Sequence, residues 1–148
     1  MISDYSSNRI LQCMFGKASG LILAQNCYLA LSSTKPNKDG SNVTEPGGNG
    51  YARKLIGSYG QAASQYMGTP ANGAITNDKE IHFDVATGPW GTLSWAAVYD
   101  QATNGNMLAA GQIGEIVSGE WQAKTISPVA DSVVVLKVNS LNFSITDN

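Results

Sequence analysis

The feature that most constrains the fold is the alternation of apolar and polar residues along the chain. A two-residue period is typical of β-strands that bury one face. In one clear example, Leu93, Trp95, Ala97 and Tyr99 alternate with smaller or more polar residues, which predicts that Trp95 lies in the core. The strand candidates are residues 27–33, 52–59, 81–85, 92–99, 107–113, 133–138 and 141–146.

Turn signals separate these short strands and indicate how they pair. Asn72-Gly73 and Asn104-Gly105 are typical tight-turn dipeptides, and the ATGPWG segment predicts a hairpin between residues 81–85 and 92–99. The β-branched run at residues 133–138 favours a central strand. The sequence therefore predicts a mainly β fold: an antiparallel β-sandwich, similar to a jelly roll, in a single domain spanning residues 1–148.

Two segments depart from the strand pattern. Residues 1–16 predict a short N-terminal helix or arm, because Ser3 or Asp4 can cap a helix and Gly16 can end it. This helix is either a docking arm or inter-subunit contact, or a lid over one open end of the sandwich. Residues 32–50 are rich in glycine, proline and asparagine, which predicts a long exposed loop.

Composition excludes several classes of partner. Only 14% of the 148 residues are charged and the formal net charge is −2, so the chain lacks the basic surface that holds nucleic acid. The longest apolar stretch contains Gln25 and Asn26, so no membrane-spanning segment is expected. The opening residues include Asp4 and do not resemble a secretory signal, which suggests synthesis in a cytoplasm.

Enzymatic and metal chemistry find little support in the residue pattern. His82 is the only histidine and shares a strand face with Asp84, but no nucleophile motif accompanies the pair, so both are interpreted as exposed strand positions. Asn37, Asp39 and Asn42 resemble half of a calcium loop, although a plain turn is favoured. We expect no catalytic residue, no cofactor and no metal, and the pairing of the two cysteines stays open.

Candidate contact residues are therefore aromatic or large and apolar. On the N-terminal helix they are Tyr5, Met14 and Phe15. For Trp90 and Trp121 the sequence leaves three roles open: packing in the core, anchoring a protein interface, or stacking on a sugar.

Two motifs carry a resemblance to a known family. TEPGGNGYAR is followed by ATGPWGT, within a stretch from about residue 28 to residue 113 that resembles small virion proteins of tailed bacteriophages, labelled tail fibre or head-associated proteins. The resemblance implies a non-enzymatic structural part that assembles in many copies on the virion, built in the host cytoplasm.

The short length and the absence of a repeated shaft favour an oligomeric capsid decoration protein, with a trimer the most plausible form. The alternative is a knob or adaptor on a tail fibre or baseplate that binds carbohydrate on the host. The expected partners are further copies of the chain and the major capsid or tail proteins of the phage.

Overall fold

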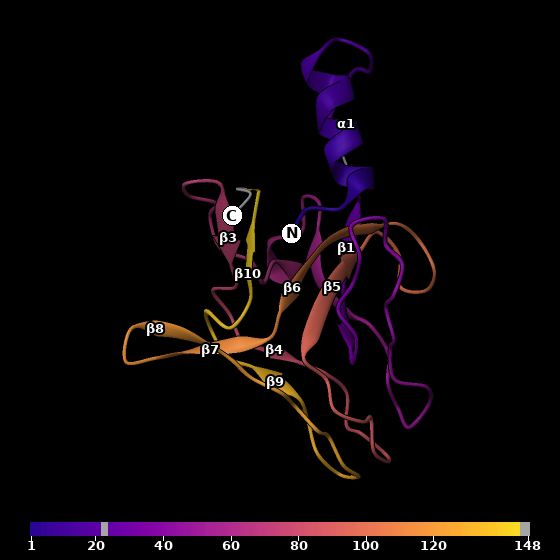
Figure 1. Ribbon diagram of the computed structural model, residues 1–148, viewed down its shortest axis with the longest axis vertical. Coiled ribbons are helices and arrows are strands. Elements are labelled where there is room, and N and C mark those ends of the chain that lie inside the picture. Colours follow the sequence, from indigo (N-terminus) through magenta and orange to yellow (C-terminus); the bar gives the residue numbers. More distant parts are fainter. Residues whose placement is uncertain (22–23, 146–148) are drawn as a thin grey trace.

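The computed structural model describes residues 1–21 and 24–145 and shows a mainly β fold with a short N-terminal helix (Figure 1). All named strand pairs are antiparallel, as predicted. The elements are α1 (Asp4–Met14), β1 (Asn26–Ser32), β2 (Lys54–Ser58), the 3-10 helix η1 (Ala62–Ser64), β3 (Ala74–Thr76), β4 (Ile81–His82), β5 (Trp95–Tyr99), β6 (Met107–Gln112), β7 (Gly114–Val117), β8 (Glu120–Ala123), β9 (Val135–Leu136) and β10 (Asn142–Ser144).

A four-stranded sheet in the order β2-β1-β5-β6 forms the centre of the fold. Its two middle strands are buried on both faces: Leu29 and Leu31 of β1 belong to the larger hydrophobic cluster, whereas Ala30 belongs to a second, smaller one. The small alanines of β5 and β6 allow segments to approach the sheet closely on both sides. The alternation of apolar and polar residues predicts one buried face for β1 and β5, whereas both of their faces are buried.

Three two-stranded sheets, β10-β3, β4-β9 and β7-β8, complete the named pairings. The larger cluster joins β1, β5 and β6 to β4, β9 and β10 through side chains such as Ile81, Leu136 and Phe143. These ladders are two to four residues long, so the chain is antiparallel and β-rich without the two continuous sheets of a jelly roll.

The predicted hairpin at residues 81–99 is wrong. β4 pairs with β9, whereas β5 lies between β1 and β6. The intervening chain is held instead by residues 126–128: the Leu93 N–H donates to Ile126 O at 2.8 Å, and the Trp90 N–H donates to Pro128 O at 3.2 Å. The ATGPWG segment therefore leads the chain into the core rather than turning it back on itself.

Two further expectations about strands change. Residues 133–138 form only the two-residue β9, and Val133, Val135 and Val138 are exposed, so this run is not a central strand. Trp95 is half-buried, and Lys35 Nζ lies 5.6 Å from the centre of its ring. This face of the central sheet, which carries the smaller hydrophobic cluster, is covered by a loop and not by a second sheet. The predicted last strand is shorter, β10, and its residue 146 lies outside the described residues.

The loop expected at residues 32–50 contains no helix or strand after Ser32, but part of it is packed. Ser32 is the buried last residue of β1, Pro36 is buried, and Val43 packs against the smaller hydrophobic cluster. The loop therefore covers one face of the central sheet.

Candidate functional site

The N-terminal helix begins where the sequence predicts. Ser3 is the N-cap residue, and its hydroxyl accepts a hydrogen bond from the Ser6 N–H at 3.1 Å. Gly16 has a φ of +66° just after the helix, a backbone conformation that glycine adopts without strain.

The first turn of α1 is fastened to β6. The Ser3 N–H and the Ser6 hydroxyl both donate to Leu108 O, at 3.1 and 2.8 Å. Ile2 forms an antiparallel bridge with Ala109, so the chain before the helix extends the central sheet beside its edge strand. Tyr5 is half-buried against the larger hydrophobic cluster, which makes it an anchor for the helix rather than a free contact residue.

The far end of α1 stands away from the body of the molecule (Figure 1). Leu11 is 50% exposed, Met14 71% and Phe15 72%, although all three are large and apolar. The contacts of α1 with the strands are concentrated on β6 through its first turn. Only the first turn of α1 packs on the body, and among the described residues the end of α1 is exposed and apolar, which favours the docking arm over the lid.

A second apolar projection is the β7-β8 hairpin, which extends from another side of the molecule (Figure 1). Trp121 is 42% exposed and lies opposite Ile116, which is also exposed. The Trp121 ring packs over Gly114, where an added Cβ would clash with the indole. Gly114 is required for this packing.

Trp90, in contrast, lies in the core. It is 5% exposed, and its ring meets those of Tyr51 and Phe83 at centroid distances of 5.2 and 6.3 Å in edge-to-face geometry. Its indole N–H donates to Asn49 O at 2.8 Å. Trp90 therefore offers no exposed face for a ligand in this structure.

The two motifs that carry the resemblance bind each other. The backbone carbonyl of Asn49, in the first motif, accepts hydrogen bonds from the Trp90 indole N–H and the Thr87 N–H. The Asn49 side-chain amide donates to Pro89 O at 2.9 Å. Gly88 is needed opposite, because a Cβ there would lie 2.8 Å from the Asn49 side chain. The motifs therefore form one structural junction.

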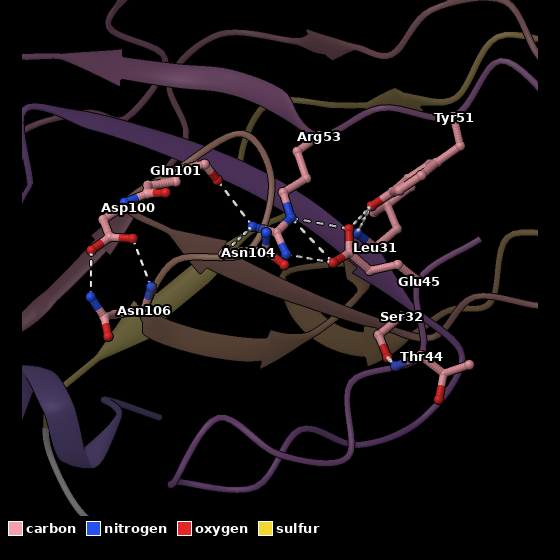
Figure 2. Close-up of polar contacts among 10 residues, drawn as sticks. All are labelled: Leu31, Ser32, Thr44, Glu45, Tyr51, Arg53, Asp100, Gln101, Asn104 and Asn106. Atoms are coloured by element: carbon pink, nitrogen blue, oxygen red, sulfur yellow. Dashed lines mark hydrogen bonds and ion pairs between the residues drawn. The ribbon is translucent and has the colours of Figure 1, made fainter. Parts of the chain in front are cut away.

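The first motif also supplies a polar network, which Figure 2 shows. Glu45 accepts hydrogen bonds from Tyr51 Oη at 2.8 Å and from Arg53 Nη2 at 2.6 Å. Arg53 donates through Nη1 to the carbonyls of Gln101 and Asn104, at 3.0 and 2.7 Å. One arginine thus joins the loop after β1 to the turn between β5 and β6.

Burial and stacking stabilise this network. The Arg53 guanidinium lies 3.6 Å from the centre of the Tyr99 ring. Tyr51 Oη accepts a hydrogen bond from the Leu31 N–H at 3.0 Å, and burial raises the pKa of Tyr51 far above its usual value, so the phenol stays neutral. Sequence inspection missed this network because Arg53 bonds to carbonyls that lie 48 and 51 positions further along the chain.

The candidate acid–base residues lie on the surface. His82 is exposed, as predicted, and its Nε2 lies 3.1 Å from Glu80 Oε2; Asp84 is exposed as well. The calcium-like loop is a turn in which Asp39 accepts hydrogen bonds from the Ser41 N–H and hydroxyl at 2.9 and 2.6 Å. These bonds lower the pKa of Asp39. Within residues 1–21 and 24–145 no cluster of His, Cys, Asp and Glu is arranged to hold a metal ion.

An open groove of about 440 Å³ lies between the base of the β7-β8 hairpin and the segment that contains β9. Ile113, Val133 and Val135 line it together with the ion pair of Lys124 and Glu115, in which Nζ and Oε2 are 2.8 Å apart.

None of the helices in the described residues has the length and apolar composition of a membrane-spanning segment.

These observations define a small β-rich protein whose motifs build a scaffold and whose two projections both carry exposed apolar side chains. Comparison with family models places it: residues 1–126 match the family described as Podophage GP4 fiber I protein gp80, and the chain belongs to that family. It is therefore a structural protein of the phage fibre type and a component of the virion. No curated protein matches the chain.

The match agrees with the alternative predicted from the sequence, a tail fibre protein, and gives no support to the first choice of capsid decoration. The matched residues include both α1 and the β7-β8 hairpin. Length and composition could not separate these two locations, because both require a rigid β domain with few charges.

Proposed function

We propose that this chain is a non-enzymatic subunit of a podophage tail fibre, and that the exposed end of α1 attaches it to a larger phage tail protein. It assembles in several copies in the host cytoplasm before or during tail assembly. The family match supports the fibre, and the exposure of Leu11, Met14 and Phe15 supports the attachment.

The exposed end of α1 is the observation that carries the attachment. A free surface helix normally turns its apolar stripe toward the protein core. Here the stripe points to solvent, while the first turn is fixed to β6 by hydrogen bonds through Ser3 and Ser6. Apolar side chains on a rigidly held helix can enter a groove of a partner with little further loss of backbone entropy.

The charges on α1 suggest that the contact is mainly apolar. The helix carries Asp4 near its start and Arg9 in its middle, and no basic residue in its last turn. We therefore expect weak dependence of the attachment on salt.

The test is incorporation into virions. Phage particles that lack this chain would be complemented with the wild type or with a variant carrying Leu11→Glu, Met14→Glu and Phe15→Glu. The variant should fold normally, since these side chains are exposed, but be absent from purified particles. A matched control changes Tyr59, Val129 and Ile145, which are also exposed and apolar, to glutamate. Equal incorporation of both variants would contradict the proposed attachment.

Carbohydrate binding finds less support. A stacking platform built from Trp90 and Trp121 would need both rings at the surface, and Trp90 is buried. Trp121 alone is an exposed aromatic ring.

A further inference from the structure

We propose that β8 is the contact through which two copies of this chain associate, by antiparallel pairing of β8 with β8 of the second copy about a two-fold axis at Gln122. This inference goes beyond the fibre assignment and does not depend on the attachment through α1.

The starting observation is an open strand edge. In the described part of the chain β8 pairs with β7 alone, and all four of its residues are exposed. The hairpin projects from the body of the molecule (Figure 1). An isolated two-stranded hairpin is marginally stable in water, and an unprotected edge is a template for another strand. This hairpin has no proline in β7 or β8 that would block such pairing.

The pairing within the hairpin determines which backbone groups face outward. The Lys124 N–H donates to Ile113 O at 2.9 Å, and the register places Glu115 opposite Gln122. Because backbone groups alternate in direction along a strand, the even-numbered residues of this segment face β7. The N–H and C=O groups of Trp121 and Ala123 therefore point to the open edge.

A two-fold axis can relate the two β8 strands in only a few registers. The outward-facing residues of one copy meet those of the other only when the axis passes beside a residue, which then lies opposite its own counterpart. An axis at Gln122 places Trp121 opposite Ala123 of the second copy, and their backbone N–H and C=O groups can hydrogen-bond to each other. Because of the symmetry, this pair occurs twice. The same axis places Glu120 opposite Lys124, again twice. An axis at Trp121 or at Ala123 forms no such opposite-charge pair. Charge complementarity therefore selects the register at Gln122 and selects a second copy as the partner.

The geometry of these charges is favourable. Glu120 and Lys124 would be a pair without backbone hydrogen bonds between them, the type in which side chains lie closest. Lys124 already contacts Glu115 at 2.8 Å with about half of its side chain exposed. Its three ammonium donors allow it to bind a second carboxylate as well.

The opposite face of the paired strands is apolar. Trp121, Ile116 and Ala123 share this face with Gly114, because opposite residues in the hairpin register point to the same side. The small side chain of Ala123 leaves room for the Trp121 ring of the second copy. Pairing would thus join two exposed apolar patches into one four-stranded surface.

The mass of the purified full-length chain in solution tests the proposal. Analytical ultracentrifugation over a range of concentrations should show twice the 15.6 kDa protomer mass. Glu120→Lys places like charges opposite each other twice and should weaken the dimer by about tenfold or more. Glu80→Lys is the control, because it makes the same charge change at another exposed glutamate.

A second set of variants tests the register. Ala123→Pro removes an N–H that faces the open edge and not β7, so it should abolish the dimer while the melting temperature stays close to that of the wild type. Ala123→Ser keeps the N–H and should still dimerise. The charge swap, Glu120→Lys with Lys124→Glu, should restore the dimer. It is made together with Glu115→Gln, because Glu115 would otherwise face the new glutamate at position 124.

A monomer at all concentrations, a trimer, or a dimer that neither Glu120→Lys nor Ala123→Pro weakens would each overturn the proposal. A trimer would favour the stoichiometry expected from the sequence. The variant with three glutamates on α1 should dimerise normally yet fail to enter virions, so the two proposals fail separately.

Discussion

Replacing Trp90 with alanine should reveal how strongly the two motifs hold the fold together. The indole is 5% exposed, contacts the rings of Tyr51 and Phe83, and donates its N–H to Asn49 O at 2.8 Å. Removing a large buried ring costs about 3–5 kcal/mol of unfolding free energy. Trp90→Ala should fall in the upper half of that range, because it loses both the aromatic contacts and the link between the motifs.

Trp90→Phe separates the two contributions. It keeps most of the ring and loses the hydrogen bond to Asn49 O, which still accepts the Thr87 N–H at 2.9 Å. Since the carbonyl is not left without a partner, the expected loss is only about 1 kcal/mol for the hydrogen bond, with a smaller addition for the lost ring area.

Urea denaturation followed by circular dichroism provides the measurement. With an m-value near 2 kcal/mol/M, a loss of 4 kcal/mol lowers the midpoint by about 2 M. Trp121→Ala is the matched control, because that indole is 42% exposed, and it should lose far less when compared at low protein concentration. A Trp90→Ala midpoint that matches the control would refute the conclusion that the motifs form a structural junction.

Three other measurements test separate parts of the structure. Arg53→Lys keeps the charge but cannot bridge Glu45 and two carbonyls in one plane, so thermal unfolding should show a loss of about 1–3 kcal/mol, and a wild-type melting curve would contradict the network. Ser3→Ala removes the N-cap of α1 and should cost about 1 kcal/mol with lower helical circular dichroism; unchanged protease resistance of the helix would argue against the cap. Hydrogen bonds from Ser41 lower the pKa of Asp39 in the folded state, so the stability that they contribute is present above the ordinary carboxyl pKa of about 3.9 and is lost as the pH falls through the lower folded value. Asp39→Asn should therefore flatten the acid side of the stability profile, and an identical profile for both proteins would exclude this contribution.

Local signals in the sequence predicted the elements that depend on neighbouring residues. The helix cap at Ser3 and the turns at Asn72-Gly73 and Asn104-Gly105 are found where expected, and in both turns each residue has a positive φ. The strands β2, β5 and β6 also lie within the predicted ranges, and β1 begins one residue before its range. Each of these features is decided within a few residues of the chain.

The errors concern contacts between distant segments. The period of residues 81–85 shows that Ile81 and Phe83 are buried, but it does not show which strand lies beside them, and β9 is more than 50 positions away. Trp90 follows a glycine and a proline, which indicates a turn, yet the carbonyl of Asn49 and two aromatic rings draw it inside. Burial of both faces of β5 depends on the loop after β1, which no local pattern reveals.

The candidate contact residues divide in the same way. Met14 and Phe15 are exposed because the helix extends beyond its anchor on β6, whereas Tyr5 is one turn from that anchor and packs against the core. Helical spacing identifies these residues as apolar positions but does not reveal where the body of the protein ends.

The location of this chain on the particle tests the central conclusion most directly. Cryo-electron microscopy of phage particles, with an antibody fragment bound to an exposed segment of the chain, should place the label on the fibres of the tail. Label distributed over the capsid surface, or particles that carry no label while the chain is present in the lysate, would contradict its role as a fibre subunit.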